Sequence, residues 1–94
     1  MLYLLKATFK PGVEAQRHAI HDAFSAHIAQ SHPRVRLGGS LQDEAGGRVG
    51  VLIILEADDR AQAERFVASS PYTKAGLYAR TEIERLDLEV GTLG

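Results

Sequence analysis

The chain has 94 residues, of which 45% are hydrophobic and 24% are charged, and its formal net charge is −1. This composition is typical of a single small globular domain over residues 1–94, and it excludes the basic surface of a nucleic-acid-binding protein. The lack of cysteine excludes a disulfide framework, a thiolate zinc site and a cysteine nucleophile.

The N-terminal segment predicts a strand that is covered on both faces. Residues 2–9 (LYLLKATF) are rich in strand-forming residues and end at Lys10-Pro11-Gly12, which is typical of a turn. Both alternating sets of side chains are largely apolar, which indicates that neither face lies in water. No basic, cleavable leader precedes this segment and no apolar run could span a bilayer, so we expect a cytoplasmic protein without a membrane partner.

Residues 13–30 predict the first helix. Ile20, Phe24 and Ile28 recur at every fourth position, with Val13 on the same stripe, so one face of the helix is apolar. We expect the helix to end before Pro33, because the residue that precedes a proline avoids the α-helical region.

Two further strands are joined by a hairpin. Residues 34–41 alternate in the manner of a strand, residues 42–47 (QDEAGG) offer two glycines for a turn, and residues 49–57 (VGVLIILEA) form the clearest strand of the chain. This last strand is again apolar on both faces.

A second helix and a short helical turn follow. Asp58 or Asp59 is placed to cap the second helix. In the segment SSPYTKAG, Ser70 takes the N-cap position, and Pro71 takes the first helical position, where its missing N–H costs nothing. Gly76 is suited to end the turn in the left-handed region.

The last strand is expected over residues 78–90, with a bulge or bend between Ile83 and Leu86, where the apolar set changes parity. The order β-α-β-β-α-β predicts a ferredoxin-like α+β fold, in which both helices cover one face of an antiparallel sheet. Because the first and third strands are apolar on both faces, the second face predicts sheet-to-sheet homodimerisation into a dimeric α+β barrel. A C-terminal tail folded across that face is the alternative.

All four histidines, His18, His21, His27 and His32, lie in or just after the first helix, but no two are spaced i,i+4 on one face, so we expect no metal site. His21 and His27 flank the apolar stripe. Arg17 lies four residues before His21 and stacks on the same side of the predicted helix. The two side chains either line a pocket between helix and sheet, or they are a snorkelling arginine and a boundary histidine.

Asp43 lies in the hairpin loop, and its role there has two possible interpretations. It either closes an Asx-turn or partners an imidazole. A carboxylate beside a histidine favours the imidazolium and fixes the ring, which gives an acid–base pair that works near neutral pH. The sequence contains no nucleophile elbow, phosphate loop or dinucleotide fingerprint.

Several motifs resemble those of the YCII-related (YciI-like) family. The most specific is SPYTKAGLYARTEI at residues 70–83, which is similar to a signature that runs from a short helix into the last strand. The others are His21 with Phe24, GGSL at residues 38–41, DEAGG at residues 43–47 and GVLIILE at residues 50–56.

The resemblance implies a dimeric ferredoxin-like barrel, similar in fold to muconolactone isomerase, in which a histidine and an aspartate face a cleft. By residue match these are His21 and Asp43, and the substrate-binding positions are Arg17 and Ser70. The chain departs from the family pattern at three places, where Ser70 replaces an aspartate, Ser40 replaces a proline and Glu84-Arg85-Leu86 replaces an R-P-W sequence.

The resulting prediction is proton transfer of the isomerase or lyase type on a small cyclic or aromatic-derived acid or lactone. His21 would be the general acid–base, Asp43 its orienter and Arg17 the partner of an anionic substrate group, and no cofactor is needed. The alternatives are a non-catalytic dimeric module that binds small molecules or assists a larger enzyme, and a cofactor-free monooxygenase on the same barrel.

Overall fold

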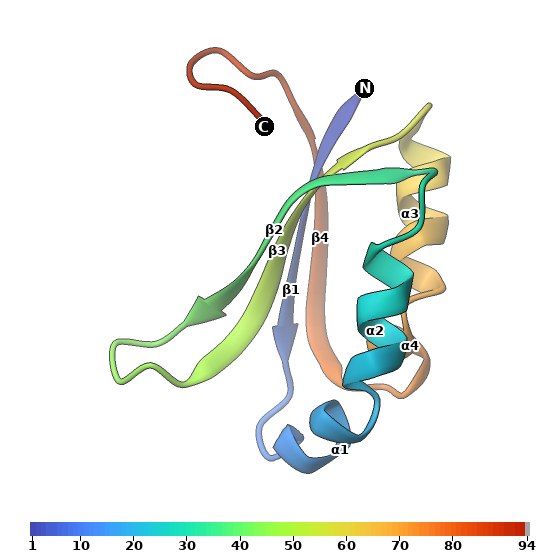
Figure 1. The fold of residues 1–94 in the computed structure, drawn as a ribbon. Helices are drawn as coiled ribbons and strands as arrows, with labels where there is room; N and C mark the ends of the chain where they lie inside the picture. The colour runs from blue at the N-terminus through green and yellow to red at the C-terminus, as the bar shows by residue number, and fades with distance from the viewer. Residues whose placement is uncertain (94) are drawn as a thin grey trace.

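The computed structural model describes residues 1–93, which fold into one antiparallel sheet with its helices on one face (Figure 1). The strand order is β2-β3-β1-β4, and this confirms the ferredoxin-like α+β class. None of the helices in these residues is long and apolar enough to span a membrane. The elements are β1 (Leu2–Phe9), α1 (Glu14–Ala19), α2 (His21–Ile28), β2 (Arg34–Gln42), β3 (Arg48–Glu56), α3 (Arg60–Ala68), α4 (Pro71–Lys74) and β4 (Tyr78–Leu86).

The core lies between the helices and the two central strands. Residues that pair directly across β1 and β3 point to the same face, so alternate residues of both strands form one apolar layer under the helices. One aromatic side chain from each of α2, α3 and α4 packs on this layer. The buried residues of the layer are Tyr3, Leu5, Ala7, Phe9, Val51, Ile53 and Leu55, and the helical aromatics are Phe24, Phe66 and Tyr72.

The helix predicted over residues 13–30 is two helices, which corrects the sequence-based expectation. Ile20 lies between α1 and α2 with φ −116° and ψ 17°, outside the α-helical region. Its side chain still packs against the core, so the apolar stripe persists while the main chain changes direction. The placement of Arg17 and His21 on one face of a single helix therefore does not hold.

Two predicted helix ends are confirmed. The carboxylate of Asp59 accepts a hydrogen bond of 2.8 Å from the amide of Gln62 and thereby caps α3. Gly76 follows α4 with φ +70°, and the amide of Leu77 donates to the carbonyl of Tyr72 at 3.0 Å. This is a Schellman ending, and it explains the glycine that separates the short helix from β4.

The irregularity predicted between Ile83 and Leu86 is wrong. β1 and β4 pair in continuous register from Leu2↔Leu86 to Thr8↔Arg80, and the register shifts only beyond that point. Residues three apart in a regular strand point to opposite faces, so the change of parity needs no bulge. The strand also ends at Leu86 rather than near residue 90.

The sheet face opposite the helices is apolar at its centre. Leu37, Ile54 and Leu4 are paired across β2, β3 and β1, so all three point to this face. The segment after β4 loops back toward β2 (Figure 1), where the carbonyl of Leu93 accepts a hydrogen bond of 3.3 Å from Arg36. This tail leaves Leu37 47% exposed, so the face is only partly covered.

Candidate functional site

The end of β2 and β3 that carries the hairpin bends away from α2 (Figure 1) and leaves an open hollow on the helical side of the sheet. This hairpin hollow has a volume of about 320 Å³ and lies between α2 and the two strands. Part of its wall lacks side chains, because Gly38, whose cross-strand partner Ile53 faces the helices, has none. Its lining includes Phe24, Ile28, Gly38, Gly39, Ser40 and Arg48.

A second hollow of about 280 Å³ lies where the turn after β1 meets α1. We call it the turn hollow. Phe9 and Val13 give it apolar walls, and Arg17 and Arg48 are the half-buried charged residues of its lining. Arg48 lines both hollows, so the two adjoin at this side chain.

The guanidinium of Arg48 has no protein partner for its buried nitrogen. Its Nε is shielded from solvent and makes no hydrogen bond. Among residues 1–93, neither Arg48 nor Arg17 takes part in an ion pair. A buried N–H without an acceptor costs free energy, and a planar guanidinium is well shaped to bind a carboxylate or another oxyanion. The arrangement is therefore suited to an anionic ligand.

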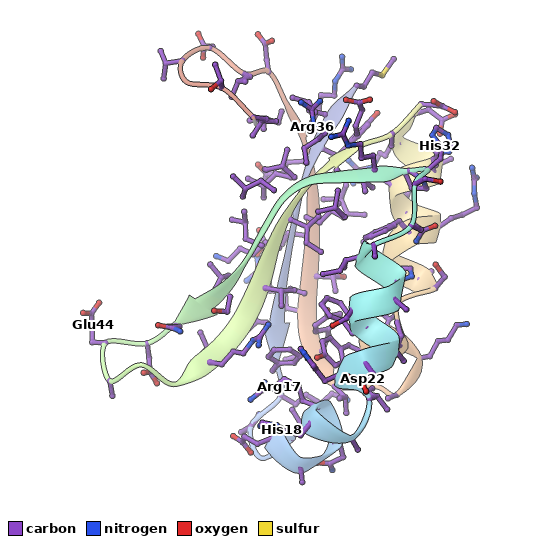
Figure 2. All side chains as sticks on the ribbon, viewed as in Figure 1. Arg17, His18, Asp22, His32, Arg36 and Glu44 are labelled. Atoms are coloured by element: carbon purple, nitrogen blue, oxygen red, sulfur yellow. The ribbon has the colours of Figure 1, made fainter. Side chains whose placement is uncertain are left out.

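Arg17 is held over an aromatic ring. Its Cζ lies 5.6 Å from the centroid of the Phe9 ring, in the range of a cation–π contact. The side chain is half-buried and belongs to α1, close to the lower end of the sheet (Figure 2). Arg17 thus lies between helix and sheet, although the change of direction at Ile20 separates α1 from the helix that carries His21.

Aromatic rings form the floor behind both hollows. The Phe24 and Tyr72 rings are stacked with centroids 4.2 Å apart, and Phe9 meets Tyr72 edge-on at 5.3 Å. Tyr72 is fully buried and its hydroxyl has no hydrogen-bond partner. Burial raises the pKa of Tyr72, and the positive charges of Arg48 and Arg17 oppose this effect. The phenol therefore stays protonated at neutral pH.

Asp43 closes its own loop, as the Asx-turn reading predicts. Its Oδ1 accepts hydrogen bonds from the amides of Ala45 at 3.0 Å and Gly47 at 2.8 Å. A Cβ on Gly47 would lie 2.9 Å from Oδ2 of Asp43, so the glycine leaves room for the carboxylate. Asp43 shapes the hairpin that borders the hairpin hollow.

The fold does not bring His21 and Asp43 together within one chain. His21 is exposed at the first position of α2, one turn before Phe24. Figure 2 shows its neighbour Asp22 beside α2, whereas Glu44, the neighbour of Asp43, lies at the far tip of the β2–β3 hairpin. No hydrogen bond links the two side chains in the part of the chain that the structure describes.

His27 is the histidine that packs inward. Its Nε2 lies 2.8 Å from the carbonyl oxygen of Phe66, and the two rings have centroids 4.3 Å apart. A carbonyl only accepts, so Nε2 carries the hydrogen. Burial lowers the pKa of His27, the bond to the carbonyl opposes this, and Lys74 adds to the lowering. Sequence reasoning placed His27 beside the apolar stripe but gave it no role.

Ser70 lines neither of the two larger hollows. It lines a small cavity of about 20 Å³, together with His27 and Tyr78. Its hydroxyl is buried without a partner and does not cap α4, although Ser70 holds the N-cap position. Burial also raises the pKa of Tyr78, to about 12. Across residues 1–93, no three His, Asp or Glu side chains gather as a metal ion would require.

Arg48 is the site residue that sequence reasoning missed. It directly precedes the apolar run of β3 and follows the two loop glycines, and this position carries no motif. Its importance arises only when β3 folds against both α2 and the turn after β1. The histidine beside the stripe was visible in the sequence, whereas the arginine between the hollows was not.

These features define a ferredoxin-like α+β protein with an arginine-lined hollow beside its sheet. The chain belongs to the YCII-related domain family, whose model matches residues 1–87. The comparison with curated proteins gives no match.

One solved structure is similar over nearly the whole chain. It is 5-chloro-2-hydroxyhydroquinone dehydrochlorinase from Burkholderia phenoliruptrix AC1100 in complex with 2,5-dihydroxybenzoquinone, with a TM-score of 0.83 and 28% identity over 93% of this chain and 94% of that chain.

Two more distant structures share the fold alone. A NIPSNAP domain protein from Burkholderia xenovorans has a TM-score of 0.54 and 21% identity, over 95% of each chain. A putative antibiotic biosynthesis monooxygenase from Chloroflexus aurantiacus J-10-fl has a TM-score of 0.51 and 18% identity, over 100% of each chain.

Proposed function

We propose that this chain is a lyase-type enzyme that moves protons on a small hydroxylated aromatic or quinone ring, which it binds as an anion at Arg48. The observation that carries the proposal is the guanidinium of Arg48, which lines both hollows, has a buried Nε without a partner and makes no ion pair within residues 1–93. The similar dehydrochlorinase, whose structure holds 2,5-dihydroxybenzoquinone, supports a ring of this kind.

Arg48 would stabilise negative charge on the ring. When a hydroxyl of the ring loses its proton, negative charge develops on the ring oxygen, and that charge is carried away when a leaving group such as chloride departs with its electron pair. A fixed guanidinium in a partly dry hollow stabilises that charge without reorganisation. Phe24 and Phe9 give the ring apolar surfaces on either side of Arg48. Binding and charge stabilisation are thus assigned to the same side chain.

His21 would exchange the proton. The resemblance of its sequence motif to that of the family implies the acid–base role, and its exposed position one turn before Phe24 leaves it in contact with solvent, the final donor and acceptor of protons. Asp43 would act indirectly, since its carboxylate holds the hairpin loop rather than an imidazole. The sequence-based acid–base pair is therefore proposed here as a single histidine, with Asp43 acting only on the conformation of the hairpin.

The hydrogen bonds of Asp43 also favour a second function, that of a non-catalytic binding module. A carboxylate committed to its loop cannot orient His21 within the same chain. Such a module would bind the ring at Arg48 without converting it. Replacement of His21 by alanine separates the two functions, because only the enzyme loses turnover.

We also propose that two copies pair through the apolar face of the sheet. Leu37 remains 47% exposed on that face, and Leu88 and Val90 of the following tail are 42% and 85% exposed. Monomers rarely leave such a patch open, and a two-fold pairing would cover it on both copies. Sedimentation of the protein would show a dimer.

The test of function uses two compounds named for the similar enzyme. Binding is measured by the absorbance change of 2,5-dihydroxybenzoquinone, and turnover by chloride release from 5-chloro-2-hydroxyhydroquinone. We expect Arg48→Gln to weaken binding about tenfold or more and His21→Ala to abolish turnover while binding persists. Arg65→Gln, at an exposed position of α3, is the matched control and should change neither. Full turnover in His21→Ala would contradict the proposed role of His21 in catalysis. Unchanged binding in Arg48→Gln would contradict the proposed binding site at Arg48.

A further inference from the structure

We infer that the ligand is a flat ring with two ionised oxygens, one at Arg48 and the second at Arg17 in the turn hollow. This rests on the proposed function and specifies its substrate class. It assigns the turn hollow as a second anion subsite, distinct from the hairpin hollow, where Phe24 and the glycines of β2 would contact the ring.

The charge of the turn hollow is strongly one-sided. Lys10, Arg17 and Arg48 contribute three positive charges to its lining, and Glu14 contributes the one carboxylate. Glu14 and Lys10 are exposed and therefore hydrated, whereas the two arginines are half-buried. Glu14 forms no ion pair with Arg17 or Arg48 in the described residues. The positive charge of the two arginines is thus available to pair with an anionic ligand.

Two like charges at one hollow select for the charge of the ligand. Without an anion, the guanidinium groups of Arg17 and Arg48 repel each other in a region of reduced dielectric constant. A monoanion at Arg48 neutralises one guanidinium. A dianion that reaches past Arg48 to Arg17 neutralises both. The stacking of Arg17 on Phe9 fixes its guanidinium before the ligand arrives, so little side-chain entropy is lost on binding.

The size of the two hollows fits a single ring. Their volumes of about 320 and 280 Å³ suit a small molecule, and because both hollows adjoin Arg48, a ring bound there is placed to reach from the first toward the second. Phe24 lines the first hollow and Phe9 lines the second, and both offer apolar contact to the ring. A flexible aliphatic diacid could pair with both arginines but would make no ring contacts with Phe9 and Phe24.

The experiment compares two quinones that differ in one ionisable group. The dianion is 2,5-dihydroxybenzoquinone, and the matched monoanion is 2-hydroxy-5-methoxy-1,4-benzoquinone. Dissociation constants are measured by calorimetry at neutral pH for the wild-type chain, Arg17→Gln, Arg17→Lys and the control Arg65→Gln. Thermal melting checks that each variant is folded.

We expect the wild-type chain to bind the dianion about tenfold more tightly than the monoanion, or about 1.4 kcal/mol. Arg17→Gln should lose this preference by weakening the dianion alone, while Arg17→Lys and Arg65→Gln retain it. If the wild-type chain binds both quinones equally, or if Arg17→Gln keeps the preference, the second subsite is wrong while the proposed function stands. If the wild-type chain binds neither quinone, the proposed function fails and this inference fails with it.

Discussion

Replacement of Tyr72 by phenylalanine should stabilise the protein. The variant keeps the ring, and with it the stacking on Phe24 at 4.2 Å and the edge contact with Phe9 at 5.3 Å. It removes only a hydroxyl that is fully buried and has no hydrogen-bond partner. A buried polar group without a partner costs about 1–3 kcal/mol, so its removal should raise the free energy of unfolding by about 1–2 kcal/mol.

Urea unfolding followed by circular dichroism measures this gain directly. For a chain of this size, about 1 kcal/mol corresponds to an increase in the melting temperature of about 4–8 °C. The urea midpoint should rise while the slope stays constant, since the surface exposed on unfolding hardly changes. Tyr3→Phe is the matched control, because the hydroxyl of Tyr3 has a weak partner in Sδ of Met1 at 3.7 Å and its loss should not stabilise. If Tyr72→Phe lowers the unfolding free energy by about 1 kcal/mol, the hydroxyl has a partner and the reasoning fails.

Three further predictions concern the packing of the fold. Because the pKa of folded His27 is lowered, the unfolded chain binds more protons as the pH falls below about 6.5. The unfolding free energy should therefore drop between pH 7.5 and pH 5, and His27→Gln should show less of this loss in urea titrations; an equal loss would contradict the buried neutral ring. In Gly50→Ala the added methyl would overlap the main-chain oxygen of Ala7, so we expect a loss of about 3 kcal/mol or more, whereas Gly39→Ala, with no atom within 4 Å, should stay within about 0.5 kcal/mol. Equal melting temperatures for these two glycine variants would show that β1 and β3 can move apart. Phe24→Ala should cost about 3–5 kcal/mol by calorimetry, and a loss below about 1 kcal/mol would contradict its central place in the core.

Much of the fold could be predicted from the sequence because its signals are local. The capping carboxylate of Asp59 and the left-handed Gly76 act on their own helices, and the structure has both as expected. The break at Ile20 could not be predicted, because no proline or glycine marks it and the residue keeps its place in the apolar stripe. A pattern of buried side chains is preserved when a helix changes direction, so periodicity does not reveal the change.

The candidate site was less accessible to prediction, because it depends on segments that are distant in sequence. Arg48 matters only where β3, α2 and the turn after β1 converge. Asp43 and His21 were joined by family resemblance, and local hydrogen bonds within the hairpin determine what the aspartate does within one chain. For Arg17, the helical spacing left open both a pocket between helix and sheet and a snorkelling side chain, and the residue lines the turn hollow although that spacing does not hold across Ile20.

The measurement that tests the central claim most directly is a map of backbone amide shifts in ¹⁵N-labelled protein titrated with 2,5-dihydroxybenzoquinone. Binding of an anionic ring at Arg48 predicts saturable shifts that are largest at Phe24, Gly39 and Arg48, with the exposed tail after β4 around Leu88 and Val90 unaffected. Shifts centred on that tail, or none at millimolar quinone, would contradict the claim that these hollows bind an anionic ring.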